Sequence, residues 1–160
     1  MSPNSSSTTK YVIDTNTLIG FSLWTPISLN SHFWNALEDA LKNGKWILLD
    51  VVVKEILYDK PLQNWCKKQK AYVTTLSNDD RNEGININNT YPMIDQATFK
   101  STVDTYIIAH AQRNGLGVFS RESPKDPNGT LNKIPDVCRM LGVPCVKKPE
   151  AFLNSIGYKN

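Results

Sequence analysis

Short apolar runs alternate along this chain with longer segments whose apolar residues recur at helical spacing. The runs predict buried strands at residues 11–14, 45–49, 72–76, 116–120 and 143–146. The longer segments predict helices, one directly after Asp14 and others over residues 31–43, 51–58, 61–70, 102–114, 133–142 and 149–157. Strands that alternate with helices are typical of βαβ units. We therefore predict an α/β fold with a mostly parallel sheet and helices on both faces.

Two stretches of the chain give no such pattern. Residues 1–9 are rich in Ser, Thr and Asn, and we expect a flexible tail there, followed by a single domain over residues 10–160. Residues 77–100 are polar and mixed, and residues 86–89 within them resemble a loop. The role of residues 77–100, in shaping a substrate groove or in binding a partner, stays open at this point.

Acidic residues follow several of the predicted strands. Asp14 ends the first strand, and Glu55 lies one turn into the helix after the second. Asp104 stands at the start of a later helix, and Glu122 comes two residues after the strand that ends at Ser120. Because the carboxyl ends of parallel strands meet at one edge of a sheet, we expect these four carboxylates to converge there.

Each acid by itself also fits a purely structural role. Asp14 and Asp104 could each cap a helix, as Asp50 is expected to do, and Glu55 and Glu122 could be exposed surface acids. Clustered carboxylates, however, repel one another unless a cation neutralises them. Oxygen ligands without His or Cys favour a hard ion such as Mg²⁺ or Mn²⁺. The joint placement therefore indicates a metal site suited to phosphoryl transfer.

The composition narrows the class of protein. Apolar residues make up 40% and charged residues 21% of the 160 residues, as in ordinary globular domains. No apolar run approaches the roughly 20 residues that cross a bilayer, and no secretory signal is recognisable. Three cysteines without a Cys-x-x-Cys pair argue against a disulfide framework or a zinc site and favour the cytoplasm. The net charge of +3 permits a polyanionic partner.

Other residue types indicate no competing chemistry. The chain has no Gly-x-Gly-x-x-Gly sequence and no P-loop, and no spacing indicates a Ser-His-Asp triad. His110 falls in an apolar helix and is expected to pack or to form a hydrogen bond. The tryptophans are expected in or near the core; they are Trp24, Trp34, Trp46 and Trp65.

Four segments of the chain resemble the motifs of PIN-domain ribonucleases. The first motif is matched by YVIDTNTLI at 11–19 and the second by VVVKEIL at 51–57. The third is matched by VDTYIIAHAQRNG at 103–115 and the fourth by VFSRES at 118–123. With KIPDVCRMLGVPCV at 133–146, the chain also resembles a bacterial PIN-like group, the DUF4411 type, related to toxin–antitoxin toxins. The resemblance implies a PIN-like three-layer α/β/α sandwich.

The resemblance also implies roles for the acids. Asp14, Glu55 and Asp104 match the three main acidic positions of the family, which bind the metal ion and support catalysis. Glu122 matches a fourth position at which Asp is commoner, so that its metal coordination is expected through water. The implied cofactor is Mg²⁺ or Mn²⁺.

Three further residues match supporting positions. Asn16 and Ser120 correspond to polar residues that orient the acids or the attacking water. Arg121 lies between Ser120 and Glu122, where its side chain could contact a phosphate or pair with a neighbouring acid. Both interpretations of Arg121 stay open.

The activity implied is that of a metal-dependent endoribonuclease. Such an enzyme hydrolyses RNA phosphodiester bonds with water as the nucleophile and leaves a 5′-phosphate and a 3′-hydroxyl. The implied partners are an RNA substrate, a cognate antitoxin protein if this is a toxin, and a second copy of the chain. No membrane association is expected.

Two alternatives compete with this interpretation. A phosphatase of the haloacid-dehalogenase type would use Asp14 as a nucleophile, but it requires a second Asp where this chain has Asn16. A PIN-like module that binds RNA or protein without catalysis is the other alternative. The complete set of four acids argues against it, because an idle site has no reason to keep mutually repelling carboxylates.

Overall fold

Three short parallel strands form the regular part of the sheet. The computed structural model describes residues 8–159, so most of the tail predicted over residues 1–9 lies outside it. The strands β1 (Tyr11–Ile13), β2 (Gly117–Phe119) and β3 (Cys145–Val146) are ordered β1-β2-β3. Each strand is parallel to its neighbour, as the alternation of strands and helices predicts.

Two further segments extend the sheet beyond β1. Ile47 forms a parallel bridge with Val12, and Leu49 forms one with Thr74. The amide of Thr74 donates to the carbonyl oxygen of Leu48 at 2.8 Å, which ties the outer segment to the inner one. The second predicted strand therefore lies beside β1 and the third beside the second, but each is reduced to isolated bridges.

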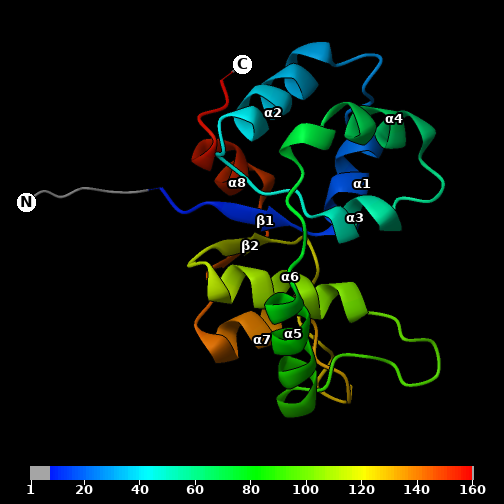
Figure 1. Ribbon diagram of the computed structural model, residues 1–160, viewed down its shortest axis with the longest axis vertical. Helices are drawn as coiled ribbons and strands as arrows, with labels where there is room; N and C mark the ends of the chain where they lie inside the picture. Colours follow the sequence, from blue (N-terminus) through cyan, green and yellow to red (C-terminus); the bar gives the residue numbers. More distant parts are fainter. Residues whose placement is uncertain (1–7, 160) are drawn as a thin grey trace, which may run out of the picture.

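Helices cover both faces of this sheet (Figure 1). One layer contains α1 (Thr15–Trp24), α2 (Ser31–Lys42), α3 (Asp50–Glu55), α4 (Lys60–Lys68) and α8 (Pro149–Ser155). The other layer contains α5 (Asn78–Thr90), α6 (Thr102–Arg113) and α7 (Ile134–Leu141), while a short 3₁₀ helix, η2 (Lys70–Tyr72), follows α4. The predicted α/β/α arrangement with a parallel sheet is confirmed. No helix among residues 8–159 is long and apolar enough to cross a membrane.

Aromatic side chains fill the core beneath the first layer. Phe119 of β2 stacks on Phe152 of α8 with ring centroids 4.7 Å apart, and Phe21 of α1 packs 5.7 Å from Phe119. Three of the four tryptophans are buried here, as predicted. Trp24 is 81% exposed, so its prediction as a core residue is wrong: the last two residues of α1, Leu23 and Trp24, no longer pack on the core.

Residues 78–90 form a helix where the polar sequence indicated a loop at 86–89, and that prediction is wrong. The helix α5 begins with a capping box. The hydroxyl of Ser77 accepts from the amide of Asp80 at 3.0 Å, and the Asp80 carboxylate accepts from the amide of Ser77 at 3.2 Å. Further along, α5 lies directly against α6. A methyl group on Gly84 would come within 2.7 Å of the Tyr106 ring, so only glycine fits without a shift.

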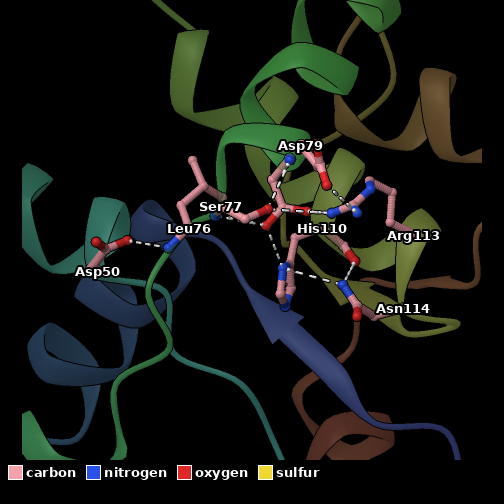
Figure 2. Close-up of polar contacts among 8 residues, drawn as sticks. Asp50, Leu76, Ser77, Asp79, His110, Arg113 and Asn114 are labelled. Carbon is pink, nitrogen blue, oxygen red and sulfur yellow. Dashed lines mark hydrogen bonds and ion pairs between the residues drawn. The ribbon is translucent and has the colours of Figure 1, made fainter.

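A buried ionic cluster joins α5 to α6 (Figure 2). The carboxylate of Asp80 lies 2.9 Å from Nδ1 of His110 and 2.6 Å from Nη1 of Arg113. Burial opposes ionisation of Asp80, but hydrogen bonds from His110, Arg113 and the Ser77 amide outweigh it and lower the pKa of Asp80. His110 thus forms the expected hydrogen bond, and the cluster anchors α6.

The helix α3 is shorter than predicted. It ends at Glu55, whereas the apolar pattern extends it to Tyr58. Leu57 and Tyr58 instead point away from the core and are 64% and 95% exposed. The capping role predicted for Asp50 is also wrong. Asp50 is the first residue of α3, and its carboxylate accepts from the amide of Leu76 at 3.0 Å on the neighbouring segment (Figure 2).

Candidate active site

Four acidic side chains from four separate segments line one pocket of about 390 Å³, which we call the acid pocket. They are Asp14, Glu55, Asp104 and Glu122. The pocket lies at the carboxyl edge of the sheet, because Asp14 directly follows β1 and Glu122 follows β2 by three residues. The structure therefore brings together all four acids that the sequence singles out.

Asp14 is both a helix cap and an acid of the pocket. One carboxylate oxygen accepts from the amide of Thr17 at 2.7 Å, which caps α1. The other accepts from the hydroxyl of Ser120 at 2.5 Å, and the Asp14 amide donates to the carbonyl oxygen of Phe119 at 3.1 Å. Asp14 is only 4% exposed. The two interpretations of Asp14 that the sequence left open are thus compatible.

Ser120 connects two of the acids from beneath the pocket. Its buried hydroxyl donates to Asp14 and accepts from the amide of Glu122 at 3.1 Å. Glu122 in turn accepts from the amide of Ile134 at 3.0 Å, at the first residue of α7. The side chains of Asp14 and Glu122 are therefore held by the ends of β2 and α7. This geometry fits the orienting role that the resemblance implies for Ser120.

Glu55 is held by a residue that the sequence did not single out as functional. The hydroxyl of Thr15 donates to Glu55 Oε1 at 2.5 Å and links the first turn of α1 to the last residue of α3. The second carboxylate oxygen of Glu55 stays available to the pocket. The signal for Thr15 is its place beside Asp14, where a buried hydroxyl can reach the same edge of the sheet.

Asp104 is the acid whose ionisation is most affected by the pocket. It is the third residue of α6, and Ser101 occupies the cap position, so the capping role considered for Asp104 is wrong. Burial raises the pKa of Asp104 to about 7, and the negative charges of Glu122, Asp14 and Glu55 add to this shift. The acid pocket is therefore a site of mutual carboxylate repulsion, which a bound cation would relieve.

The donor set fits a hard divalent ion with water molecules between the ion and part of the site. The side chains of the pocket offer oxygen atoms, and each carboxylate oxygen keeps a lone pair beyond its hydrogen bonds to the protein. Among residues 8–159, no three carboxylate, His or Cys side chains are grouped closely enough to hold an ion directly. Mg²⁺ keeps several waters and needs only one or two carboxylates, so the pocket suits it in that form.

Two lysines line the acid pocket as well, and the sequence pattern indicates neither of them. Lys100 precedes α6, and Lys133 precedes α7. Phe99 and Ser101, on both sides of Lys100, have positive φ angles of 58° and 76°, a strained conformation for residues other than glycine. Loop residues without periodicity give no pattern signal. Their position just before two helices that start at the sheet edge could have identified them.

Asn16 and Arg121 share one small pocket, but only Asn16 also lines the acid pocket. Asn16 is exposed and lines the acid pocket. Arg121 instead lines an adjoining pocket of about 210 Å³, which it shares with Asp14, Asn16 and Glu122. Its amide donates to the hydroxyl of Thr17 at 2.9 Å. Arg121 forms no ion pair among the described residues, so the interpretation as a partner of a neighbouring acid is not supported.

The fold and the pocket define an α/β protein with a cluster of acids at the carboxyl edge of a parallel sheet. Residues 11–157 match a family model described as Domain of unknown function (DUF4411). The chain belongs to this family. No curated protein and no solved structure matches it significantly.

Proposed function

We propose that this protein is an endoribonuclease of the PIN type that requires Mg²⁺ or Mn²⁺. The observation that supports the proposal most is the acid pocket, where carboxylates from four separate segments meet and where burial, together with their negative charges, raises the pKa of Asp104. An arrangement that repels itself is costly for a fold, and it is useful when a cation binds there. The order and spacing of the PIN-like motifs support the same activity.

Within this proposal the four acids bind the ion in two different ways. Asp14 and Asp104 would bind it directly, and Glu55 and Glu122 would bind through water. The bound ion would polarise the scissile phosphate and lower the pKa of an attacking water. Ser120 keeps Asp14 in place by its hydrogen bond, so that the carboxylate needs little rearrangement on binding.

The lysines of the pocket explain how a polyanion approaches four acids. Lys100 and Lys133 would contact phosphates of the RNA backbone beside the scissile one and offset the repulsion from the carboxylates. Asn16 would hydrogen-bond the substrate or the attacking water, since its side chain is exposed in the same pocket. No side-chain nucleophile is required.

The experiment that tests the activity uses the purified full chain and a pool of labelled RNAs. Cleavage should occur with Mg²⁺ or Mn²⁺, stop with EDTA and leave 5′-phosphate ends that a phosphate-dependent exonuclease digests. RNA binding without cleavage under any metal would reject the enzyme and favour the non-catalytic module. Trapping of a phosphoaspartate at Asp14 would instead favour the phosphatase.

We further propose that the enzyme is the toxin of a toxin–antitoxin pair and forms a homodimer. The support is the resemblance to toxin-related PIN-like proteins, together with an acid pocket that a basic segment of an antitoxin could enter. A short open reading frame directly upstream, whose product co-purifies with this chain and blocks cleavage, is the expected finding. A gene that stands alone, with a harmless product in growing cells, would contradict this part.

A further inference from the structure

A second cavity, larger than the acid pocket, opens directly beside it. It has a volume of about 670 Å³, and we call it the apolar groove. Its walls come from α1, from the loop between α1 and α2, and from the loop between α3 and α4. Ile19 and Glu55 line both cavities, so the apolar groove begins at the wall of the acid pocket.

The apolar groove carries large side chains that the fold itself does not bury. Leu23 is 69% exposed, and the exposed residues Leu57 and Tyr58 follow the end of α3. Ile56 between Glu55 and Leu57 is only 2% exposed and fixes this turn to the core. Contiguous exposed apolar surface of this kind marks a binding site on a folded protein. The ring of Tyr58 in particular presents its faces to solvent.

A positive charge completes the apolar groove. Lys60, the first residue of α4, lines it next to Asp59, whose carboxylate accepts from the amide of Leu62 at 3.1 Å and caps that helix. The groove therefore combines an apolar wall, an aromatic ring and an ammonium group with the carboxylates of Glu55 and Asp59. The neighbouring acid pocket adds Lys100 and Lys133 to the same surface. The apolar wall and the ring are complementary to the flat base of a nucleotide, and the three lysines, Lys60, Lys100 and Lys133, to its anionic backbone.

We propose that the apolar groove binds an unpaired base of single-stranded RNA, one nucleotide away from the phosphate in the acid pocket. The base stacks on Tyr58 and packs on Leu23 and Leu57, and Lys60 contacts the adjoining phosphate. This inference rests on the proposed function and adds a subsite to it: a groove for the base next to the scissile phosphate. A duplex cannot place a base in a groove without unstacking it. Continuity with the acid pocket through Glu55 and the added lysines favour RNA over an apolar protein segment.

Binding of short single-stranded RNAs to the full chain in EDTA tests the groove apart from catalysis. Fluorescence anisotropy with Tyr58→Ala should show affinity about tenfold weaker than that of the native chain, the effect of losing one stacked base. Tyr58→Phe keeps the ring and should bind as the native chain does. The matched control is Tyr72→Ala, which removes a partly exposed tyrosine from η2, outside the groove. The side chain of Tyr58 is almost wholly exposed, so its loss leaves the fold intact.

A second measurement identifies the base. RNAs that lack one base at a time should show one position where the loss is large for the native chain and absent for Tyr58→Ala. Equal losses in both proteins at every position, or unchanged affinity of Tyr58→Ala, would overturn the groove as a base site. The base site is also overturned if Tyr58→Ala only splits a dimer of this chain, because the groove is then a protein interface.

The outcome for the groove is separable from the outcome for the proposed function. Metal-dependent cleavage of RNA, with the same RNA affinity with and without the Tyr58 ring, would support the nuclease and reject the base site. Binding of single-stranded RNA that depends on Tyr58, without cleavage under any metal, would support the base site and reject the nuclease.

Discussion

Two groups of carboxylates lie in this small fold, and their surroundings are opposite. Asp80 is enclosed by His110 and Arg113, and its pKa is lowered although burial works against ionisation. Asp104 faces other acids, and burial, together with their negative charges, raises its pKa to about 7. The first group is neutralised by side chains of the chain itself, whereas the second, in the proposed function, is neutralised by a bound ion. A buried acid with its own cation is a structural element, and one without a cation marks a ligand site.

The same helix carries both arrangements. Asp104 lies at the start of α6, and His110 and Arg113 lie in its last two turns. The cluster around Asp80 ties that end of α6 to α5, so the helix is fixed by one charged group while it presents another to the pocket. Changes at the two ends should therefore separate stability from activity, and four experiments test this separation.

The largest effect is expected on RNA cleavage in the acid pocket. Asp14→Asn and Asp104→Asn should each lower the cleavage rate by more than about a hundredfold, the upper end for loss of a residue that only supports a ligand. Asp104→Asn should unfold at the same temperature or higher, because it removes one of the repelling charges. Asp126→Asn, an exposed acid on a loop, is the matched control and should cleave normally. Full activity in both pocket variants would reject the proposed site.

The next effect is stabilisation by the metal ion. At a Mg²⁺ concentration of about 100 times Kd, binding adds about 2.7 kcal/mol to the free energy of unfolding. For a chain of this length each kcal/mol raises Tm by about 2–4 °C. Thermal unfolding with and without Mg²⁺ should show this shift in the native chain and in Asp80→Asn, but not in Asp104→Asn. A shift that survives in Asp104→Asn would place the ion elsewhere.

The cluster around Asp80 should show the converse behaviour. Asp80→Asn removes a charge that accepts from His110 and Arg113, and it should lower the free energy of unfolding by about 2 kcal/mol at pH 7. Folding lowers the pKa of Asp80, so its stabilisation is complete above the ordinary value of about 4 and is lost as the pH falls through the lower folded value. The free energies of unfolding of both proteins, measured with urea, should therefore converge as the pH falls below the folded pKa of Asp80.

A matched control exists beside Asp80. Asp79 is exposed and lies 3.5 Å from Arg113, so Asp79→Asn should change the free energy of unfolding by less than about 0.5 kcal/mol. RNA cleavage should be retained in both variants under conditions where they are folded. Loss of cleavage in folded Asp80→Asn would show that the two groups of carboxylates are coupled.

The smallest effect is expected when the packing of α5 against α6 is changed without changing any charge. Gly84→Ala forces a methyl group against the Tyr106 ring and should lower the free energy of unfolding by about 1 kcal/mol. In a Tyr106→Ala background the ring is gone and the nearest atom that remains is Oγ1 of Thr105 at 3.1 Å, so the same change should cost less. Urea unfolding of the native chain, the two single variants and the double variant gives the change in the free energy of unfolding in each background. An equal loss in both backgrounds would contradict close packing of Gly84 on Tyr106.

Apolar periodicity predicted the sheet and most helices, because buried strands and amphipathic helices repeat at fixed intervals. It failed for α5, whose buried positions include Asp80 and Gly84, residues that carry no apolar signal. There the helix is fixed by capping and by contact with α6, which involve partners far along the chain. It also failed at Leu57 and Tyr58, which are apolar in sequence but exposed in the apolar groove.

The four acids of the pocket could be predicted because the ends of parallel strands meet at one edge by topology alone. Thr15, Lys100 and Lys133 have only their places beside Asp14 and before two helices as a signal, since their presence in the site depends on hydrogen bonds and loop conformations. The distances between the acids could not be predicted from the sequence. Residues 8–159 hold no direct cage of three ligands, so water between the ion and the acids becomes part of the proposal.

The capping of α1 by Asp14 has a consequence for how tightly the site can bind. Both oxygens of this carboxylate already accept hydrogen bonds, from Thr17 and Ser120, before any ligand arrives. The rotamer freedom of the side chain is thus lost when the chain folds, and complex formation does not have to remove it again. A weakly coordinating, mostly hydrated ion can therefore be retained by a carboxylate that is fixed in advance.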